Sequence, residues 1–532
     1  MKKTKYLVTI FLVIGFLFLA SNVVNATETY TTTSIINGVT VQWSYELNDS
    51  NEIKNLKCTN VSELTGNITI PSSLEGKNVT SLGYTAFANS TKITGITFPN
   101  TITSIGLDAF KNCTGLTTLF IPKSLTKDCG NHPFSGCTNI TSVTFEDGIT
   151  EIPAFICEDL TGITEITIPN SVTKIEGYAF DGCTKLSRIN FGTGITYLSI
   201  NAFKDCTALT SLSIPKSLTK DCGNHPFSGC TNITSVTFED GITEIPAFIC
   251  EDLTGITEIT IPNSVTKIEG YAFDGCTKLS RINFGTGITY LSINAFKDCT
   301  ALTSLSIPKS LTKDCGNHPF EGCTNITKVT FEDGITEIPA FICESLTGLT
   351  EFNIPSSVTK IGGYAFEGCS NLAQDITFPI NTINIGVEAF SNCPKLKKVT
   401  FLGEIKNMGW GEDNTAAGDS VFKNHNEDLT FYCYEDSVPA TYAINNKIKY
   451  VYLTRPSTNT PTPEEKEPSK EENTRPETTT PGKTEPTDND ETIAGGKLPY
   501  TGQEVGIFAI SISIILFGGI FAYFKYNKLK DI

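Results

Sequence analysis

The chain has 532 residues, a formal net charge of −17 and few clusters of Lys and Arg away from its ends, so nucleic acid is not expected as a partner. Two Met, two Trp and four His leave little material for metal or redox chemistry, and no cofactor is expected. Ser, Thr, Asn and Gly dominate the rest of the sequence, which is typical of a fold with many short strands and turns.

Residues 1–26 have the three zones of a secretory signal peptide. A basic segment at residues 1–5 precedes an apolar run at residues 6–20, and Val24-Asn25-Ala26 offers a small residue for cleavage. A first transmembrane helix is the alternative, but the apolar run is shorter than the about 20 residues that a span needs. Cleavage after Ala26 is therefore expected, and the mature protein is expected to be secreted.

Residues 27–66 are expected to form an N-terminal cap. The alternating segment from Val39 to Tyr45, followed by a break at Asn48-Asp49-Ser50, predicts a hairpin that covers the first coil of a repeat array.

The next 334 residues, 67–400, repeat themselves on two scales. Residues 122–214 recur without change as residues 215–307, and a diverged third copy runs from 308 to about 400. Within each 93-residue unit a Phe recurs at spacings of 24, 21, 25 and 23 residues, in a series that contains Phe134, Phe155, Phe180 and Phe203. Periods of 20 to 29 residues predict a leucine-rich-repeat solenoid.

One coil, residues 163–183, shows what each position does. Ile163, Ile166 and Ile168 give a short strand with one buried face, and Pro169-Asn170-Ser171 ends it. Ala179, Phe180 and Cys183 lie on one side of a helical turn. Because no coil can bury its apolar edge alone, coils must stack. The prediction is a mostly β solenoid with a parallel sheet on the concave face and short helical turns and irregular coils on the convex side.

Segments such as ITEITIPNSVTKIEGYAFDGC and ITGITFPNTITSIGLDAFKNC resemble the BspA-like leucine-rich repeats of bacterial surface proteins. The resemblance covers roughly residues 65–400, where the Ile-Pro-x-Ser and Ala-Phe-x-x-Cys pieces recur at matching offsets. It implies adhesion, through binding of host or matrix proteins or of other cells.

The chain beyond the repeats divides into a cap and a stalk. Residues 401–453 are expected to be a C-terminal cap, because residues 429–434 and 448–453 are strand-like and can close the last coil. Residues 454–497 are rich in Pro, Thr, Glu and Lys and hold almost no large apolar side chains, which predicts a disordered, extended stalk that spans the wall.

Residues 498–532 resemble the sorting signal of sortase-anchored proteins of Gram-positive bacteria. Leu498-Pro499-Tyr500-Thr501-Gly502 precedes an apolar span at residues 505–524 and a basic tail. The resemblance implies that a sortase cuts between Thr501 and Gly502 and joins Thr501 to peptidoglycan, after the apolar span has held the chain transiently in the membrane. Sortase and peptidoglycan are thus expected partners, and the alternative is an ordinary single-pass anchor.

Of the 18 cysteines, 13 follow a Phe of the repeat and occupy one recurring position from Cys113 to Cys393. They could form a disulfide framework, since the protein is exported, or a buried spine of thiols, which their equivalent positions favour. Cys129, His132 and Cys137 hint at zinc ligands, but they number three and lack a CxxC pair, so no metal site is expected. No catalytic motif is present, and the chain is not expected to be an enzyme.

The outward positions of the predicted sheet form a candidate ligand strip, displayed in two identical copies. Linked weak sites of this kind would gain avidity, whereas the alternative for any one residue is a merely solvated face. The strip consists of Glu165, Thr167, Arg188 and Asn190 in the first copy and Glu258, Thr260, Arg281 and Asn283 in the second.

Two functions remain open at this point. The first is a surface protein that binds an extracellular protein or glycan, and the second is a structural wall protein whose repeats only set length and spacing.

Overall fold

The computed structural model describes residues 28–409 and 421–455. Ala26 and the rest of the predicted signal peptide, residues 456–497 of the predicted stalk, the motif from Leu498 to Gly502 and the apolar segment at 505–524 lie outside the described residues. In the part that is described, no helix is both long and apolar enough to cross a membrane.

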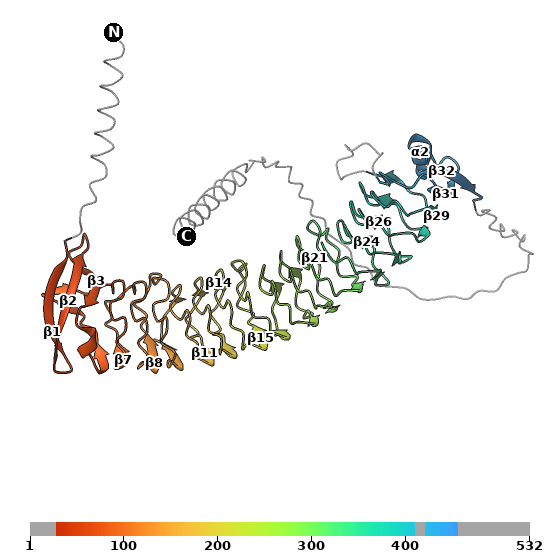
Figure 1. The fold of residues 1–532 in the computed structure, drawn as a ribbon. Coiled ribbons are helices and arrows are strands. Elements are labelled where there is room, and N and C mark those ends of the chain that lie inside the picture. The colour runs from red at the N-terminus through yellow and green to blue at the C-terminus, as the bar shows by residue number, and fades with distance from the viewer. Residues whose placement is uncertain (1–27, 410–420, 456–532) are drawn as a thin grey trace, which may run out of the picture. The chain divides into compact units, whose positions relative to one another are not determined.

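The N-terminal end is an antiparallel sheet of three strands in the order β1-β2-β3 (Figure 1), followed by a short 3-10 helix. The expected hairpin is therefore incomplete, because a tight turn at Asn37-Gly38, where both residues have positive φ, adds a strand before it. Trp43 is buried in this sheet and meets the ring of Phe87 edge-on at 5.9 Å, which ties the sheet to the first coil. The bounds are Tyr30–Ile36 for β1, Val39–Leu47 for β2, Ile53–Cys58 for β3 and Val61–Glu63 for η1.

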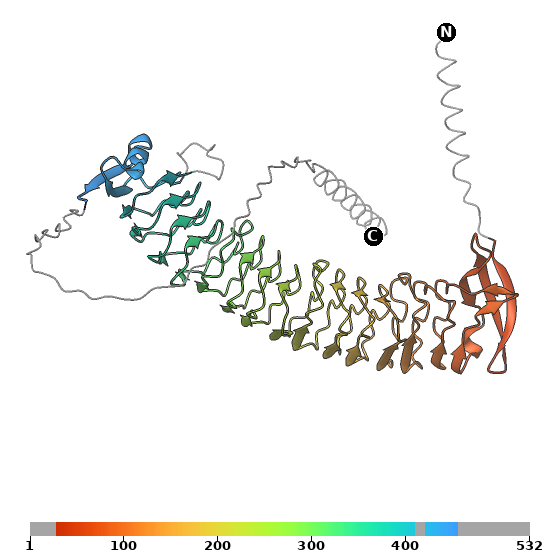
Figure 2. The ribbon, with the colours of Figure 1, turned by 180° about the vertical axis from the view of Figure 1, so that it is seen from behind.

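Beyond this sheet the chain winds as a parallel β-solenoid of about 16 coils that stack in chain order (Figures 1 and 2). The predicted leucine-rich-repeat solenoid is confirmed. One side of the coils carries the longer strands, whose alternate side chains are buried and exposed as the sequence pattern predicts. These strands are β4 Gly66–Thr69, β7 Ile93–Thr97, β8 Thr118–Ile121, β9 Ser142–Phe145, β11 Glu165–Thr167, β13 Arg188–Asn190, β15 Ser211–Ile214, β16 Ser235–Phe238, β18 Glu258–Thr260, β20 Arg281–Asn283, β22 Ser304–Ile307, β23 Lys328–Phe331, β25 Glu351–Phe352, β27 Ile376–Phe378 and β29 Lys398–Phe401.

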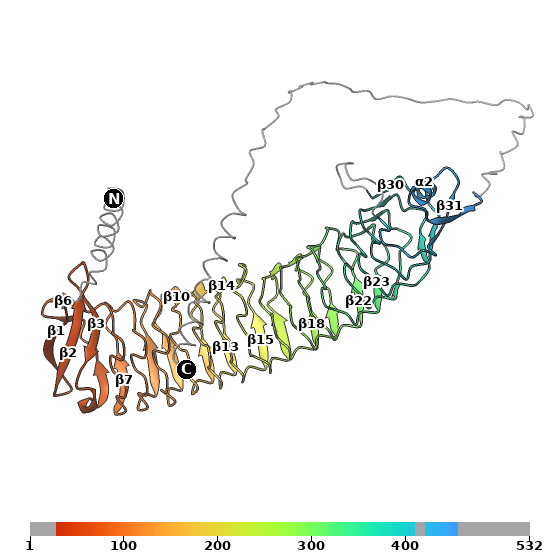
Figure 3. The same cartoon turned by 45° about the horizontal axis from the view of Figure 1, so that its top comes forward.

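A second ladder of two-residue strands, which the sequence pattern did not predict, runs along another side of the coils, as Figure 3 shows for β10 and β14. Each strand pairs an exposed or half-buried residue with a buried Ile, Leu or Met, as in Lys174-Ile175. The strands are β10 Glu151–Ile152, β12 Lys174–Ile175, β14 Tyr197–Leu198, β17 Glu244–Ile245, β19 Lys267–Ile268, β21 Tyr290–Leu291, β24 Glu337–Ile338, β26 Lys360–Ile361, β28 Asn384–Ile385 and β30 Asn407–Met408. A separate antiparallel pair, β5 Ser73–Leu74 and β6 Lys77–Asn78, precedes them.

The interior is built on stacked Phe rings. Phe180 stacks on Phe203 with 4.9 Å between ring centroids, and Phe203 stacks on Phe227 at 5.4 Å. All three side chains are fully buried. Equivalent stacks of three join Phe87, Phe110 and Phe134; Phe273, Phe296 and Phe320; and Phe366, Phe390 and Phe422.

Phe155 is not a member of this interior series, which corrects the spacing derived from the sequence. Its φ of 61° and its main-chain bond to the next coil match those of Tyr178, whose φ is 58°. Its half-buried ring stacks on Tyr178 at 5.3 Å, near the surface. The interior position of Phe180 is filled in this coil by Cys157, so the true spacings from Phe110 are 24, 23, 23 and 23 residues.

The coils are closed at the C-terminal end by a strand, a short helix and a strand. β31 (Thr430–Tyr434) and β32 (Lys449–Leu453) extend the ladder in the order β27-β29-β31-β32. Helix α2 (Val438–Asn445) begins at Ser437, whose Oγ accepts a hydrogen bond from the main-chain N–H of Ala440.

Candidate ligand-binding surface

The predicted strip residues of the first copy lie side by side on β11 and β13. Glu165 is opposite Arg188, and Thr167 is opposite Asn190, in a parallel register. Glu165, Thr167 and Arg188 are exposed, whereas Asn190 is half-buried. The second copy repeats this arrangement on β18 and β20, where Glu258 is opposite Arg281 and Thr260 is opposite Asn283. We call these outward side chains of the longer strands the strand face.

Hydrogen bonds hold the strip residues in place. Asn190 Nδ2 donates to Glu165 Oε1 at 2.6 Å and to Thr167 Oγ1 at 3.2 Å, and the second copy has the same two bonds from Asn283. Arg188 approaches Glu165 only to 3.9 Å, and its side chain is 70% exposed. The guanidinium is thus free to contact a partner, while the carboxylate is held in a fixed position.

The longer strands do not form one continuous sheet. β8 pairs with β9, and β11 pairs with β13, but β9 and β11 are not paired. The same break recurs between β16 and β18. Each break opens a groove on the strand face, of about 520 Å³ in the first copy and about 710 Å³ in the second.

The two grooves have the same lining chemistry. Hydroxyl groups of Ser142, Thr144 and Thr167 and carboxylates of Asp147 and Glu165 surround the first groove, and no Lys or Arg contributes to either lining. Asp147 is exposed and makes no ion pair with any described residue. The sequence pattern had placed Glu165 and Thr167 on the outward face, but it gave no signal for the break in pairing that makes a groove beside them.

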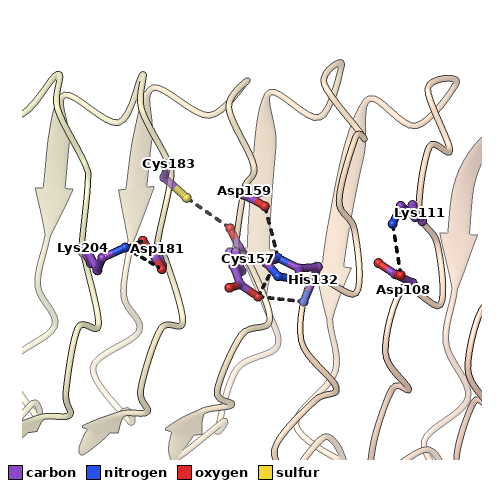
Figure 4. A network of polar contacts seen from close by, with 9 residues as sticks. Asp108, Lys111, His132, Cys157, Asp159, Asp181, Cys183 and Lys204 are labelled. Carbon is purple, nitrogen blue, oxygen red and sulfur yellow. Dashed lines mark hydrogen bonds and ion pairs between the residues drawn. The ribbon is translucent and has the colours of Figure 1, made fainter. Parts of the chain in front are cut away.

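A second polar cluster lies on the turns that carry the Phe series (Figure 4). His132 Nδ1 is 3.3 Å from Glu158 Oε2 and 3.2 Å from Asp159 Oδ2. The main-chain N–H of His132 donates to the same Glu158 oxygen at 2.7 Å. Burial raises the pKa of Glu158, although the hydrogen bond and the nearby His132 oppose the shift. His225 repeats both contacts with Glu251 and Asp252, whereas His318 has Glu344 and, in place of the Asp, Ser345.

This geometry does not support zinc ligation by Cys129, His132 and Cys137. The ring nitrogen of His132 faces carboxylates, and Cys137 Sγ donates to the carbonyl of Phe110 at 3.1 Å. Within residues 28–409 and 421–455, no group of three or more His, Cys, Asp or Glu side chains is arranged to hold a metal ion.

All 18 cysteines are described, free and buried. Three of the 13 cysteines predicted at the recurring position, Cys157, Cys250 and Cys343, instead take the ring position of the Phe series. The others donate a hydrogen bond from Sγ to a carbonyl of the preceding coil, as Cys183 does to Cys157 at 3.1 Å (Figure 4). Burial raises the pKa of Cys183, and it raises the pKa of Cys129 to about 12, so these two thiols stay protonated at neutral pH. This arrangement is a spine of thiols inside the coils.

The chain is similar to several solved structures. A leucine-rich-repeat protein from Bacteroides ovatus is 21% identical, with 80% of this chain and 98% of that chain covered and a TM-score of 0.43. A leucine-rich cell surface protein from Faecalibacterium prausnitzii is 25% identical, with coverages of 70% and 95% and a TM-score of 0.33. The pneumococcal vaccine antigen PcpA is 16% identical, with coverages of 80% and 99% and a TM-score of 0.36. No curated protein matches the chain.

The family comparison is more extensive. The model described as the BspA type leucine rich repeat region, with six copies, matches residues 51–175, 150–254, 243–373 and 372–424. These matches join into one stretch that covers the solenoid and well over half of the chain, and they indicate no enzymatic family. The chain belongs to the BspA-type leucine-rich-repeat family.

Proposed function

We propose that this protein is a cell-surface adhesin, anchored to peptidoglycan, whose strand face binds an extracellular protein or glycan. The observation that carries the proposal is the exact duplication of a hydrogen-bonded polar strip, Glu165 to Asn190 and Glu258 to Asn283, on an otherwise regular scaffold. Membership of a family of surface repeats supports an extracellular location. Two weak sites joined by one rigid body bind a repetitive surface more tightly than either does alone.

The anchoring part of the proposal rests on the two chain ends. Export requires the signal that ends at Ala26, and attachment requires sortase to cleave between Thr501 and Gly502. A Thr501→Ala variant should leave the wall fraction and accumulate in the membrane fraction or the medium. Retention of that variant in muramidase-released wall material would refute covalent anchoring through Thr501.

Binding is tested with the secreted chain against arrays of matrix proteins, mucins and glycans. The variant with Glu165, Arg188, Glu258 and Arg281 all changed to Ala should lose affinity for the captured ligand. These side chains are exposed and do not belong to the Phe stacks, so the fold should be kept and a circular dichroism spectrum should be unchanged. If the variant binds every ligand as the parent does, the strip is not the binding surface.

The second candidate, a wall spacer without a ligand, predicts a different response to deletion of one 93-residue unit. An adhesin with one strip per unit should lose avidity when residues 215–307 are removed. A spacer should retain whatever binding the remaining chain has and lose only length.

A further inference from the structure

The grooves at the breaks between β9 and β11 and between β16 and β18 are lined in part by residues with unpaired main-chain groups. The main-chain N–H of Glu146 donates to the carbonyl of Ile121 at 2.9 Å, so in the parallel register of β8 and β9 the N–H and C=O of Phe145 point away from β8, toward β11. No hydrogen bond joins either group to another described residue, because β9 and β11 are unpaired. The bond from Glu239 to Ile214, also 2.9 Å, orients Phe238 in the same way in the second copy.

In the third copy, a side chain of the chain itself pairs with the corresponding main-chain groups. At the position of Thr167 and Thr260 it has Asn353, whose Oδ1 accepts from the main-chain N–H of Phe331 at 2.8 Å. Its Nδ2 donates to the carbonyl of the same Phe331 at 3.1 Å. Phe331 is the counterpart of Phe145 and Phe238, and the bond from Glu332 to Ile307 orients it in the same way. One carboxamide therefore satisfies both main-chain groups that the first two copies leave open.

A second carboxamide forms the same pair of hydrogen bonds elsewhere in the solenoid. Between the unpaired strands β25 and β27, Gln374 Oε1 accepts from the main-chain N–H of Phe352 at 2.9 Å, and Gln374 Nε2 donates to its carbonyl at 2.8 Å. A primary carboxamide suits this place because it carries a donor and an acceptor on one edge. A carboxylate lacks the donor, and a trans secondary amide, such as the acetamido group of an amino sugar, points its N–H and C=O in opposite directions.

We infer that each groove of the first two copies is a slot for the carboxamide of an Asn or Gln side chain presented by a partner polypeptide. The inference rests on the proposed function and names the chemistry of its ligand. Thr167 cannot fill the slot itself, because its side chain is short and its Oγ1 already accepts from Asn190. A ligand that forms hydrogen bonds with these unpaired main-chain groups lowers the free energy of the complex, which gives the slot its affinity.

The charges around the slot favour a neutral or basic segment. Asp147 and Glu165 line the first groove and no Lys or Arg does, so an acidic glycan or a phosphate would be repelled. The exposed carboxylate of Asp147 is free to pair with a Lys or Arg beside the bound Asn. Because Asp240 and Glu258 repeat the arrangement, a partner with two such segments can occupy both slots.

The test fills both slots in a full-length Thr167→Asn/Thr260→Asn variant, which introduces the Asn that the third copy has at this position; we call it the plugged variant. The probes are short fluorescent peptides flanked by Lys, with Asn, Gln, Asp or Leu at one central position. The parent should bind the Asn and Gln peptides about tenfold more tightly than the Leu and Asp peptides, which corresponds to the loss of one or two hydrogen bonds. The plugged variant should lose this preference. Equal binding of all four peptides by the parent overturns the inference.

Hydrogen exchange supplies the second measurement and Thr400→Asn the control. Thr400 lies on β29, which pairs with strands on both sides, β27 and β31, so Asn at that position should change neither peptide binding nor exchange at the slots. The amides of Phe145 and Phe238 should exchange faster than that of Phe331 in the parent, and should slow in the plugged variant or when an Asn peptide binds. Binding of an Asn peptide without this protection also overturns the inference.

The outcomes for the slot and for the proposed function can be told apart. If the strip variant loses an extracellular ligand but the plugged variant, with its amides protected, keeps it, the strand face binds and the slot does not. If no array ligand binds at all, the proposed function fails, while the peptide preference still decides the slot.

Discussion

The third copy of the 93-residue unit keeps the ring positions of the first two but differs from them on its surface and at two buried positions, where Leu349 and Phe352 replace Ile163 and Ile166. Phe320, Cys343 and Phe366 fill the same buried positions as Phe134, Cys157 and Phe180. On the surface, Asn353 stands where Thr167 does, and Lys328 stands where Ser142 does. Interior side chains must pack against both neighbouring coils, whereas a surface side chain contacts only solvent or a partner and can change more freely. A comparison of the copies therefore distinguishes the residues that stabilise the solenoid from the residues that it exposes to a partner.

Truncation of the interior rings should cost the most, and it should cost at least as much in the third copy, where Phe352 also stacks on Phe366 at 4.2 Å. Phe180 and Phe366 are fully buried and stack on the next ring at 4.9 and 5.1 Å. Phe180→Ala and Phe366→Ala should each lower the free energy of unfolding by about 3–5 kcal/mol, measured by urea unfolding followed by circular dichroism. Phe155→Ala is the control, because its half-buried ring contributes about 1 kcal/mol through stacking on Tyr178. A much smaller loss at Phe366 would show that the ring positions are not equivalent.

Opening the closed junction of the third copy should have the next largest effect. Asn353→Thr removes both hydrogen bonds to the main chain of Phe331 and should cost about 1–2 kcal/mol. The amide of Phe331 should then exchange as fast as those of Phe145 and Phe238, as read by hydrogen exchange. The exposed change Ser306→Thr should leave both quantities unchanged. Persistent protection of Phe331 would mean that the strands β23 and β25, and not Asn353, close this junction.

The coils could be predicted well from the sequence because the packing of their interior depends on the identity and spacing of the side chains. The buried Ile residues of each strand and the inward Ala, Phe and Cys of Tyr178-Ala179-Phe180-Asp181-Gly182-Cys183 were recognised from period and spacing alone. The prediction at Phe155 was wrong because the ring position of this coil was assigned to its Phe, whereas Cys157 is the residue that occupies it.

The candidate site was only half predictable, for a physical reason. The outward positions of Glu165 and Arg188 follow from strand alternation, and the structure places them opposite each other. The groove depends on which main-chain groups of β9 and β11 fail to pair, and every residue type except Pro carries the same main-chain groups. The substitution of Asn353 for Thr167 was the one sequence difference that could have pointed to it.

The buried glutamates beside the histidines should give a pH-dependent stability. Burial raises the folded-state pKa of Glu158, Glu251 and Glu344. Each therefore stabilises the fold below the ordinary Glu pKa, and that contribution is lost as pH rises through the raised value. The triple Glu→Gln variant should flatten this fall, which begins above the ordinary Glu pKa of about 4.3.

The copies again provide the comparison for this cluster. Asp159 and Asp252 lie beside the first two histidines, whereas Ser345 takes that place in the third copy. In addition to burial, Glu367 and Glu321 raise the pKa of Glu344, as Asp159 and Asp181 raise that of Glu158. The single changes Glu158→Gln and Glu344→Gln should therefore both flatten the slope of stability against pH. Unfolding midpoints across pH measure both slopes. A triple variant with the slope of the parent would place the pH dependence in other groups.

The smallest effect is expected from the ion pair on the strand face of the third copy. Lys328 Nζ lies 2.7 Å from Glu351 Oε1, and both side chains are more than half exposed. Lys328→Ser, which restores the residue of the first copy, should cost no more than about 1 kcal/mol, and the loss should fade at high salt. Ser142→Lys in the first copy, at the position equivalent to Lys328, should give at most a small gain in the urea midpoint, because β9 and β11 are not paired. A loss much larger than this at Lys328 would mean that the ion pair holds β23 against β25, so that the third copy differs from the first two through charge as well as through the carboxamide of Asn353.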